Sequence, residues 1–283
     1  MPPPKKKKDA TEDTTSFIFD QVNQASDVTA VEQLLKVIKE GLNVWNIRNE
    51  NHETLLHVAA KNGQNKVAEL LIKRGADVNS SDKERTTPLQ RAMDAGHKTV
   101  GHKTVAKLII KHGANIEATD RENNTPLVVA LTKGDTKLAE FIIQHGADLT
   151  HCDNKRRTPL HLAASNGYDN TVELLLRRGA SVDAGDGHVT PLFAAANTGH
   201  EKVVETLLRH GADVNALSND PRNGSLWIIF LRRHRKITEL LIRHGADVGS
   251  GRLGEDTLLH YAASNGDTVT AQLLIEHGAQ LEA

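Results

Sequence analysis

The sequence predicts an all-α solenoid of stacked helix–turn–helix units, and two regularities carry this prediction. A short segment that usually begins Thr-Pro-Leu or Thr-Leu-Leu recurs seven times, and a Gly-Ala pair follows each copy. The glycine lies 21 residues after the start of the segment in six copies, and successive copies start 32 to 34 residues apart except at one longer step. Such a period is typical of repeats that pack only on their neighbours. The segments start at Thr54, Thr87, Thr125, Thr158, Thr190, Gly224 and Thr257.

The unit that starts at Thr158 indicates why each repeat should contain two short helices. Thr158 is a good N-cap, and Pro159 suits the first helical position, where no amide donor is needed. Gly167 and Gly179 can adopt the left-handed conformation that ends each helix. Two helices of this length cannot bury an apolar face alone, so the units must stack. The apolar stripes contain Leu160, Ala163 and Ala164 in the first helix and Val172, Leu175 and Leu176 in the second.

Composition limits both the class of protein and the class of partner. The chain has 283 residues, of which 3% are aromatic, so its core must consist of Leu, Ile, Val and Ala. A formal net charge of −1 gives no overall positive field to attract nucleic acid or an anionic membrane. The single cysteine, Cys152, suits a reducing compartment. We therefore expect a monomer in the cytoplasm, the nucleus or both, with neither nucleic acid nor a membrane as its partner.

The first 47 residues precede the regular repeats. Residues 1–15 are rich in proline and charged residues, which predicts a disordered tail. Within it, Pro2–Lys8 is either a nuclear-import patch or electrostatic tether, or only a solvated tail. Residues 16–47 lack the Thr-Pro-Leu start but carry an amphipathic helical pattern, so they predict an N-terminal capping repeat. That pattern is formed by Val31, Leu34, Leu35 and Ile38.

The unit TPLHLAASNGYDNTVELLLRRGASVDA, from Thr158, resembles the ankyrin repeat, whose Thr-Pro-Leu-His-x-Ala signature it carries. The resemblance extends over seven phased repeats in residues 48–283. It implies L-shaped units joined by short β-hairpin loops, and a concave partner-binding side formed by hairpin tips and first helices. It also implies hydrogen bonds between repeats from the histidines of the signature, which are His57, His161 and His260.

One repeat contains the five residues Gly-His-Lys-Thr-Val twice in succession, over residues 96–105. Deleting either copy restores the usual interval from Thr87 to the closing glycine, Gly113. Threading the extra residues through the second helix would turn its apolar stripe away from the core. We therefore expect a surface bulge at the turn between the helices, with the second copy continuing into the second helix. The bulge is either a new contact loop or a tolerated insertion without a role.

The motifs indicate no catalytic or metal site. Gly249–Gly254 matches the Gly-x-Gly-x-x-Gly dinucleotide pattern, but it occupies a loop between repeats without the preceding strand that the pattern needs. His52 and His57 lie five residues apart, whereas a helical zinc motif needs a spacing of four. Most other histidines follow the repeat phase. We expect no enzymatic activity, no cofactor and no metal.

The remaining candidates for function are surface residues. By repeat phase, the hairpin tips and the ends of the first helices carry polar and charged side chains, which would bind a partner through hydrogen bonds and charge. The same side chains are equally explained as ordinary solvated surface. The predicted partner-binding residues in these places are Arg85, Arg121, Lys133, Lys155, Arg157, Asn166 and His188.

The repeat over residues 218–251 departs from the pattern. Trp227 takes the place of the signature histidine, and Arg233 takes that of the turn glycine. This is either a drifted repeat or a specialised contact site for an acidic partner, because Trp and Arg are enriched at binding hot spots. The predicted partner-binding residues here are Trp227, Arg232, Arg233, Arg235 and Lys236.

Two asparagines are candidates for modification. Asn79 and Asn215 each follow a leucine by eight residues, which is similar to the context in which ankyrin asparagines are hydroxylated. They are equally explained as turn residues chosen for their hydrogen bonding to the backbone.

The sequence therefore predicts a non-catalytic protein-interaction module that binds a protein or peptide on its concave groove. The alternative is a regulatory or targeting domain of a longer enzyme or channel, which the abrupt stop at Ala283 allows.

Overall fold

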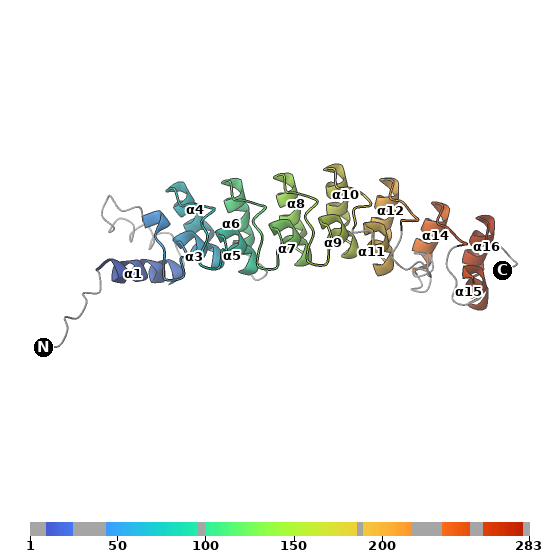
Figure 1. The fold of residues 1–283 in the computed structure, drawn as a ribbon, viewed down its shortest axis with the longest axis horizontal. Helices are drawn as coiled ribbons and strands as arrows, with labels where there is room; N and C mark the ends of the chain where they lie inside the picture. The colour runs from blue at the N-terminus through green and yellow to red at the C-terminus, as the bar shows by residue number, and fades with distance from the viewer. Residues whose placement is uncertain are drawn as a thin grey trace. The chain divides into compact units, whose positions relative to one another are not determined.

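The computed structural model of the chain describes residues 10–24, 44–95, 100–185, 189–216, 234–249 and 257–279. These residues form short helices joined by turns, and no β-strand occurs among them. The chain divides into two compact units, Met1–Arg121 and Glu122–Ala283, and Figure 1 shows the paired helices within each. The predicted all-α class is confirmed, and the connections expected to be β-hairpins are tight turns wherever they are described.

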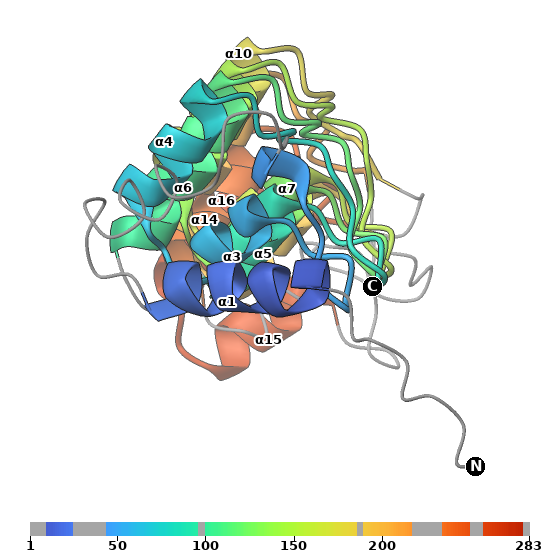
Figure 2. The ribbon, with the colours of Figure 1, turned by 90° about the vertical axis from the view of Figure 1, so that its left-hand side faces the viewer.

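The first unit contains two helix pairs and a covering helix. Helix α3 packs on α5, α4 packs on α6, and α1 packs on α3. Figure 2 shows the resulting layers, with α3 and α5 together in one and α4 and α6 in the other. The elements are α1 (Ala10–Gln24), the 3-10 helix η1 (Val44–Asn46), α3 (Leu55–Lys61), α4 (Asn65–Lys73), α5 (Pro88–Ala95) and α6 (Val100–Lys111).

Helix α1 covers the outer face of α3. Its apolar side chains Ile18, Phe19 and Val22 are buried. The side-chain amide of Asn62, which caps the end of α3, donates to Asn23 Oδ1 at 2.9 Å. Helix α1 begins at Ala10, within the predicted disordered tail, and the capping repeat over residues 16–47 stays a prediction. The amphipathic pattern predicted after residue 30 lies outside the described residues.

The second unit repeats the same arrangement. In one layer α7 packs on α9 and α9 packs on α11, and in the other α8, α10, α12, α14 and α16 follow one another. The elements are α7 (Pro126–Thr132), α8 (Thr136–Gln144), α9 (Pro159–Ser165), α10 (Asp169–Arg177), α11 (Pro191–Thr198), α12 (Glu201–Arg209), α14 (Arg235–Arg243), α15 (Leu258–Ser264) and α16 (Thr268–Glu276).

Thr-Pro-Leu-His or Thr-Leu-Leu-His forms the start of α3, α9 and α15, as predicted. At α9, the backbone N–H of Thr158 donates to His161 Nδ1 at 3.3 Å, and Thr158 Oγ1 accepts the N–H of His161 at 3.4 Å. His161 Nε2 then bonds the carbonyl oxygen of Val189 at the start of the next repeat. His57 makes the corresponding bond to the carbonyl oxygen of Thr86 at 3.0 Å. The expected hydrogen bonds between repeats are therefore present at His57 and His161. For His260 the printed contacts are with Thr257 of its own repeat, and its bond between repeats stays a prediction.

The predicted apolar stripes lie in the core. Leu160, Ala163 and Ala164 are buried in α9, and Val172 and Leu175 are fully buried in α10. Leu176 is only partly buried, because it lies at the edge of the stripe.

The duplicated segment lengthens one helix. Helix α6 has 12 residues and begins at Val100, whereas α4 and α8 have 9 residues each. Val100 is 82% exposed, so the first residue of the lengthened helix projects into solvent, whereas His102 is buried. The second copy continues into α6 as expected. The predicted bulge falls on residues 96–99, which lie outside the described residues.

Rings at the start of the second helices pack over the turn glycines of the preceding repeat. A Cβ atom built on Gly167 would lie 2.6 Å from Nδ1 of His200, and one on Gly63 would lie 2.9 Å from Nδ1 of His102. Both glycines also have positive φ angles, of 71° and 66°. Two separate constraints therefore require glycine at these turns.

Candidate functional site: the turn tips around Arg91

The turn tips are the loops that lead into the first helices, and three of them share one hydrogen-bond pattern. Each begins with an Asn or Asp whose side-chain oxygen accepts backbone N–H groups two and four residues later. Asp82 Oδ1 accepts from Glu84 N at 2.8 Å and from Thr86 N at 2.9 Å. Because these bonds tie each tip to itself, its exposed side chains extend from a fixed backbone. The tips with this pattern are residues 49–53, 82–86 and 153–157.

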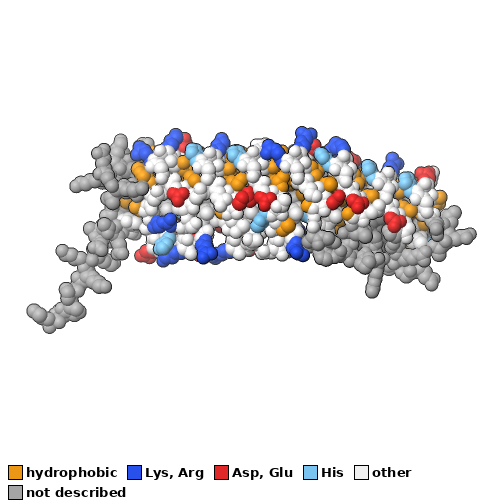
Figure 3. Space-filling model, turned by 45° about the horizontal axis from the view of Figure 1, so that its top comes forward, with side chains coloured by type: hydrophobic (Ala, Val, Ile, Leu, Met, Phe, Trp, Pro, Cys, Tyr) orange, Lys and Arg blue, Asp and Glu red, His pale blue; other side chains and the backbone are white. Residues whose placement is uncertain are grey.

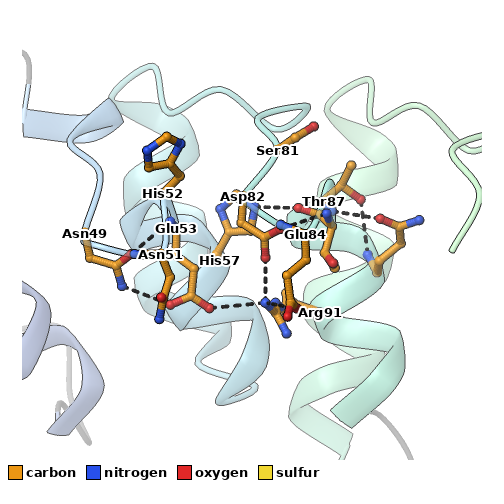
Figure 4. A network of polar contacts seen from close by, with 12 residues as sticks. Asn49, Asn51, His52, Glu53, His57, Ser81, Asp82, Glu84, Thr87 and Arg91 are labelled. Carbon is orange, nitrogen blue, oxygen red and sulfur yellow. Dashed lines mark hydrogen bonds and ion pairs between the residues drawn. The ribbon is translucent and has the colours of Figure 1, made fainter. Parts of the chain in front are cut away.

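Arg91 joins two of these tips in the first unit. It extends from α5, and its Nη2 atom lies 2.5 Å from Asp82 Oδ2, 3.3 Å from Glu84 Oε2 and 3.5 Å from Glu53 Oε1. Figure 4 shows the guanidinium at the meeting point of these carboxylates. The Arg91 side chain is 22% exposed and that of Asp82 only 1%. The corresponding positions of other described first helices carry apolar residues, namely Val58, Val129, Leu162, Ala194 and Tyr261.

The second unit neutralises its tip aspartate differently. There Asp153 Oδ2 accepts from Nε of Arg157 at 2.8 Å and from Nη2 at 2.7 Å, and both residues belong to the same tip. In the first unit Thr86 stands in the place of Arg157, and the guanidinium comes from Arg91 on the helix. Arg91 uses Nη2 alone, and its buried Nε has no hydrogen-bond partner in the described part of the chain. The geometry of Arg91 therefore serves several carboxylates at once.

The hydrogen bonds and burial around Arg91 also shift the pKa values of Asp82 and His57. Burial alone would raise the pKa of Asp82, but hydrogen bonds from Thr86 N and from Arg91 outweigh burial and lower its pKa. On the neighbouring helix, burial lowers the pKa of His57, against the opposing effects of the Thr86 carbonyl and of Asp82 and Glu53. The lowered pKa values thus favour an ionised Asp82 and a neutral His57.

Glu84 extends the cluster to the molecular surface. Its Oε2 atom faces Arg91, while its Oε1 atom lies 2.5 Å from Nη2 of Arg121. The Glu84 side chain is 49% exposed and that of Arg121 is 64% exposed. A chain of charged contacts therefore runs from a buried aspartate to an exposed arginine.

A second charged surface lies at the C-terminal ends of the second helices. In Figure 3, basic side chains and histidines gather along the edge that these ends form in each unit. His145 Nδ1 bonds the carbonyl oxygen of Phe141 at 2.8 Å, and His244 Nδ1 bonds that of Leu240 at 2.8 Å. Because a carbonyl oxygen only accepts, each Nδ1 donates a hydrogen bond to the last turn of its own helix. Among the described residues, no group of three His, Cys, Asp or Glu side chains is placed to hold a metal ion.

Comparison with known proteins identifies the family. The sequence matches the family description "Ankyrin repeats (3 copies)" over residues 21–120, 83–153, 98–186 and 150–218, and "Ankyrin repeat" over residues 255–283. The chain belongs to the ankyrin repeat family. The crystal structure of an ankyrin repeat domain from Acinetobacter baumannii AYE has a TM-score of 0.61 at 27% identity, covering 68% of this chain and 98% of that one.

Two curated relatives match a stretch of this chain. One is the ARF GTPase-activating protein GIT1 from Homo sapiens, 33% identical over 90 residues, which is 32% of this chain and 12% of that protein. The other is a putative ankyrin repeat protein from Rickettsia bellii, 28% identical over 82 residues, which is 29% of this chain and 13% of that protein. The matched stretches thus span only about an eighth of these relatives.

The ankyrin repeats place the predicted partner-binding residues in three settings. Arg85, Lys133, Lys155 and Asn166 are exposed at turn tips or first-helix ends, as expected. Two more are held in ion pairs, Arg157 with Asp153 and Arg121 with Glu84. In the first turn of α14, Arg235 pairs with Glu239 at 3.1 Å and Lys236 with Glu201 at 3.5 Å. The candidates that lie outside the described residues are His188, Trp227, Arg232 and Arg233.

Asn79 and Asn215 connect consecutive ankyrin repeats. The Asn79 amide donates to the carbonyl oxygen of Gly113 at 3.0 Å and accepts the N–H of Asn115 at 2.7 Å. Asn215 makes the equivalent bonds to Gly245 at 3.1 Å and Asp247 at 2.8 Å. These contacts account for both asparagines as turn residues, and their hydroxylation stays a prediction.

Arg91 was not among the sequence-based candidates. A signal for it exists, because it is the one charged residue at a position where the other repeats carry an apolar one. Its partners gave no such signal, since Glu53 and Glu84 resemble any exposed loop residue until the fold brings them to one guanidinium.

Proposed function

We propose that this ankyrin-repeat chain is a non-catalytic interaction module that binds a protein or peptide through its turn tips and first-helix ends. Ankyrin repeats are generally protein–protein interaction modules. The observation that carries the proposal is the pinned backbone of the tips, with exposed charged side chains such as Lys155 and Arg156 extending from it. Pre-organised charges favour specific association because little conformational freedom is lost on binding.

We further propose that the chain acts as a monomer in the cytoplasm or nucleus, with neither nucleic acid nor a membrane as its partner. The net charge of −1 supports this assignment. In the parts of the chain with a described structure, no helix has the length and apolar character needed to cross a membrane.

A capture experiment with matched variants tests the turn tips. The immobilised chain is incubated with cell lysate, and bound proteins are identified by mass spectrometry. The variant Lys155→Glu/Arg156→Glu reverses two exposed tip charges, while Lys202→Glu/Arg243→Glu reverses two exposed charges on the second helices. We expect the tip variant to lose specific partners that the wild type and the control retain. Capture of the same proteins in the same amounts by all three would contradict the proposal.

The alternative is a regulatory or targeting segment of a larger protein. It is favoured by the small share of the curated relatives that the match covers, 12% in the human ARF GTPase-activating protein. The transcript that encodes this chain distinguishes the two: an open frame that continues into a catalytic or channel domain supports the alternative.

A further inference from the structure

We infer that Glu84 is a receptor for a basic side chain of a protein partner, and that Arg121 occupies this receptor in the free chain. The inference rests on the proposed interaction function and names the partner chemistry of one turn tip. An arginine-bearing segment of the partner would bind by displacing Arg121 from the outer oxygen of Glu84.

The two oxygens of Glu84 differ in how firmly their partners are held. Oε2 lies 3.3 Å from Nη2 of Arg91, whose side chain is only 22% exposed and is fixed by the buried Asp82. Oε1 lies 2.5 Å from Nη2 of Arg121, whose side chain is 64% exposed. The inner contact orients the carboxylate, whereas the outer contact is an exposed ion pair of the kind that adds little to stability. The outer contact is therefore the one that a partner can replace.

The charge of the cluster favours a cation in this place. Glu53, Asp82 and Glu84 contribute three negative charges around the single positive charge of Arg91. Without Arg121, two negative charges remain uncompensated, and a second guanidinium is attracted. Arg121 thus shows, within the chain itself, which chemical group the outer oxygen accepts.

Neutralising Asp82 does not by itself explain the use of Arg91. The tip at Asp153 achieves the same end with Arg157 from its own loop, through two bonds to one carboxylate oxygen. Arg91 leaves its buried Nε without a hydrogen-bond partner among the described residues. This costly arrangement brings Glu84 into a fixed orientation, which an arginine within the tip would not do.

A peptide titration tests the receptor. The labelled chain is titrated at low ionic strength with acetyl-Gly-Arg-Gly-amide, and binding is followed by chemical shifts in NMR spectra. The same peptide with citrulline in place of arginine is the uncharged control. We expect binding of the arginine peptide only. The variant Arg121→Ala should bind it about two- to fivefold more tightly, because the intramolecular competitor is gone. The variant Glu84→Gln should weaken binding at least about tenfold.

A double variant separates positioning from folding. Arg91→Val alone introduces an aliphatic residue as in other repeats, but it leaves Asp82 without its guanidinium. Arg91→Val/Thr86→Arg gives Asp82 a partner within its own tip, as in the pair Asp153–Arg157. We expect both variants to bind the arginine peptide more weakly than the wild type, because Glu84 is no longer oriented by Arg91. The double variant should recover the thermal stability that the single variant loses.

Three results would overturn the inference: equal binding of the arginine and citrulline peptides, unchanged affinity in Arg121→Ala, or full binding in Glu84→Gln. Absence of binding by both the wild type and Arg121→Ala would also overturn it. The proposed interaction function is tested separately by the capture experiment, because its variant alters Lys155 and Arg156 and leaves Glu84 unchanged.

Discussion

His102 Nε2 lies 2.9 Å from the carbonyl oxygen of Lys61 in the preceding repeat, and His200 Nε2 lies 3.1 Å from that of Ser165. Lys61 and Ser165 occupy the same position in their repeats, so the two histidines make equivalent contacts. His102 belongs to the second copy of the duplicated segment. The second copy therefore supplies the ring that the repeat register requires.

This relationship predicts unequal effects of two chemically identical substitutions. His102→Ala should lower the free energy of unfolding by about 1 kcal/mol, because it removes a hydrogen bond between repeats. His97→Ala alters the corresponding residue of the first copy and should have a smaller effect. Denaturant unfolding followed by circular dichroism measures both, and equal losses would contradict the assigned register.

Removing one copy of the duplication should leave the fold intact. Deletion of Gly96–Val100 retains one glycine, one histidine and an uninterrupted second helix. We expect stability equal to or slightly above that of the wild type, because lengthening a surface turn costs only on the order of 1 kcal/mol. A cooperative loss of helicity in the deletion variant would show that the extra residues are structurally required.

Burial of a neutral imidazole makes stability depend on pH. The pKa of His57 is lowered chiefly by burial, so below its ordinary value of 6.5 the unfolded chain binds a proton that the folded chain resists. The free energy of unfolding therefore falls as the pH drops below about 6.5. His57→Gln should remove this contribution while keeping the fold, since Gln90 already accepts from Thr87 N at 2.8 Å in the next repeat. Between about pH 7.5 and 5, the free energy of unfolding should fall less for the variant than for the wild type, as unfolding curves at each pH will show.

Loss of a helix cap should lower the free energy of unfolding less than loss of a core side chain. Thr158→Ala removes the cap of α9 and should cost about 1 kcal/mol. Leu175→Ala truncates a fully buried side chain of α10 and should cost roughly 2–5 kcal/mol. Chemical denaturation that ranks the two in the opposite order would contradict the buried face assigned to α10.

The repeats were predictable from sequence because each depends on local chemistry in a fixed phase. A Thr-Pro start, an apolar stripe and a closing glycine act within one repeat and its neighbour. The cluster around Arg91 was not predictable in the same way, because it depends on which long side chains meet across two turn tips. For the duplication, the sequence predicted that the second copy continues into the second helix, and the contact of His102 with Lys61 agrees with that register.

The turn glycines allow backbone strain to be separated from packing between repeats. Gly167 and Gly179 both have positive φ angles, of 71° and 91°. A Cβ atom on Gly167 would meet the His200 ring at 2.6 Å, whereas one on Gly179 would meet nothing within 4 Å. Gly179→Ala should therefore cost about 1–2 kcal/mol, through left-handed strain alone. Gly167→Ala adds the displacement of His200 and the loss of its bond to Ser165, and should cost on the order of 1–3 kcal/mol more. Denaturant unfolding of the two variants measures the difference, and adding His200→Ala to Gly167→Ala should remove most of the excess. Equal costs for the two single variants would show that the ring yields freely and that its contact with the glycine contributes little to the packing of the repeats.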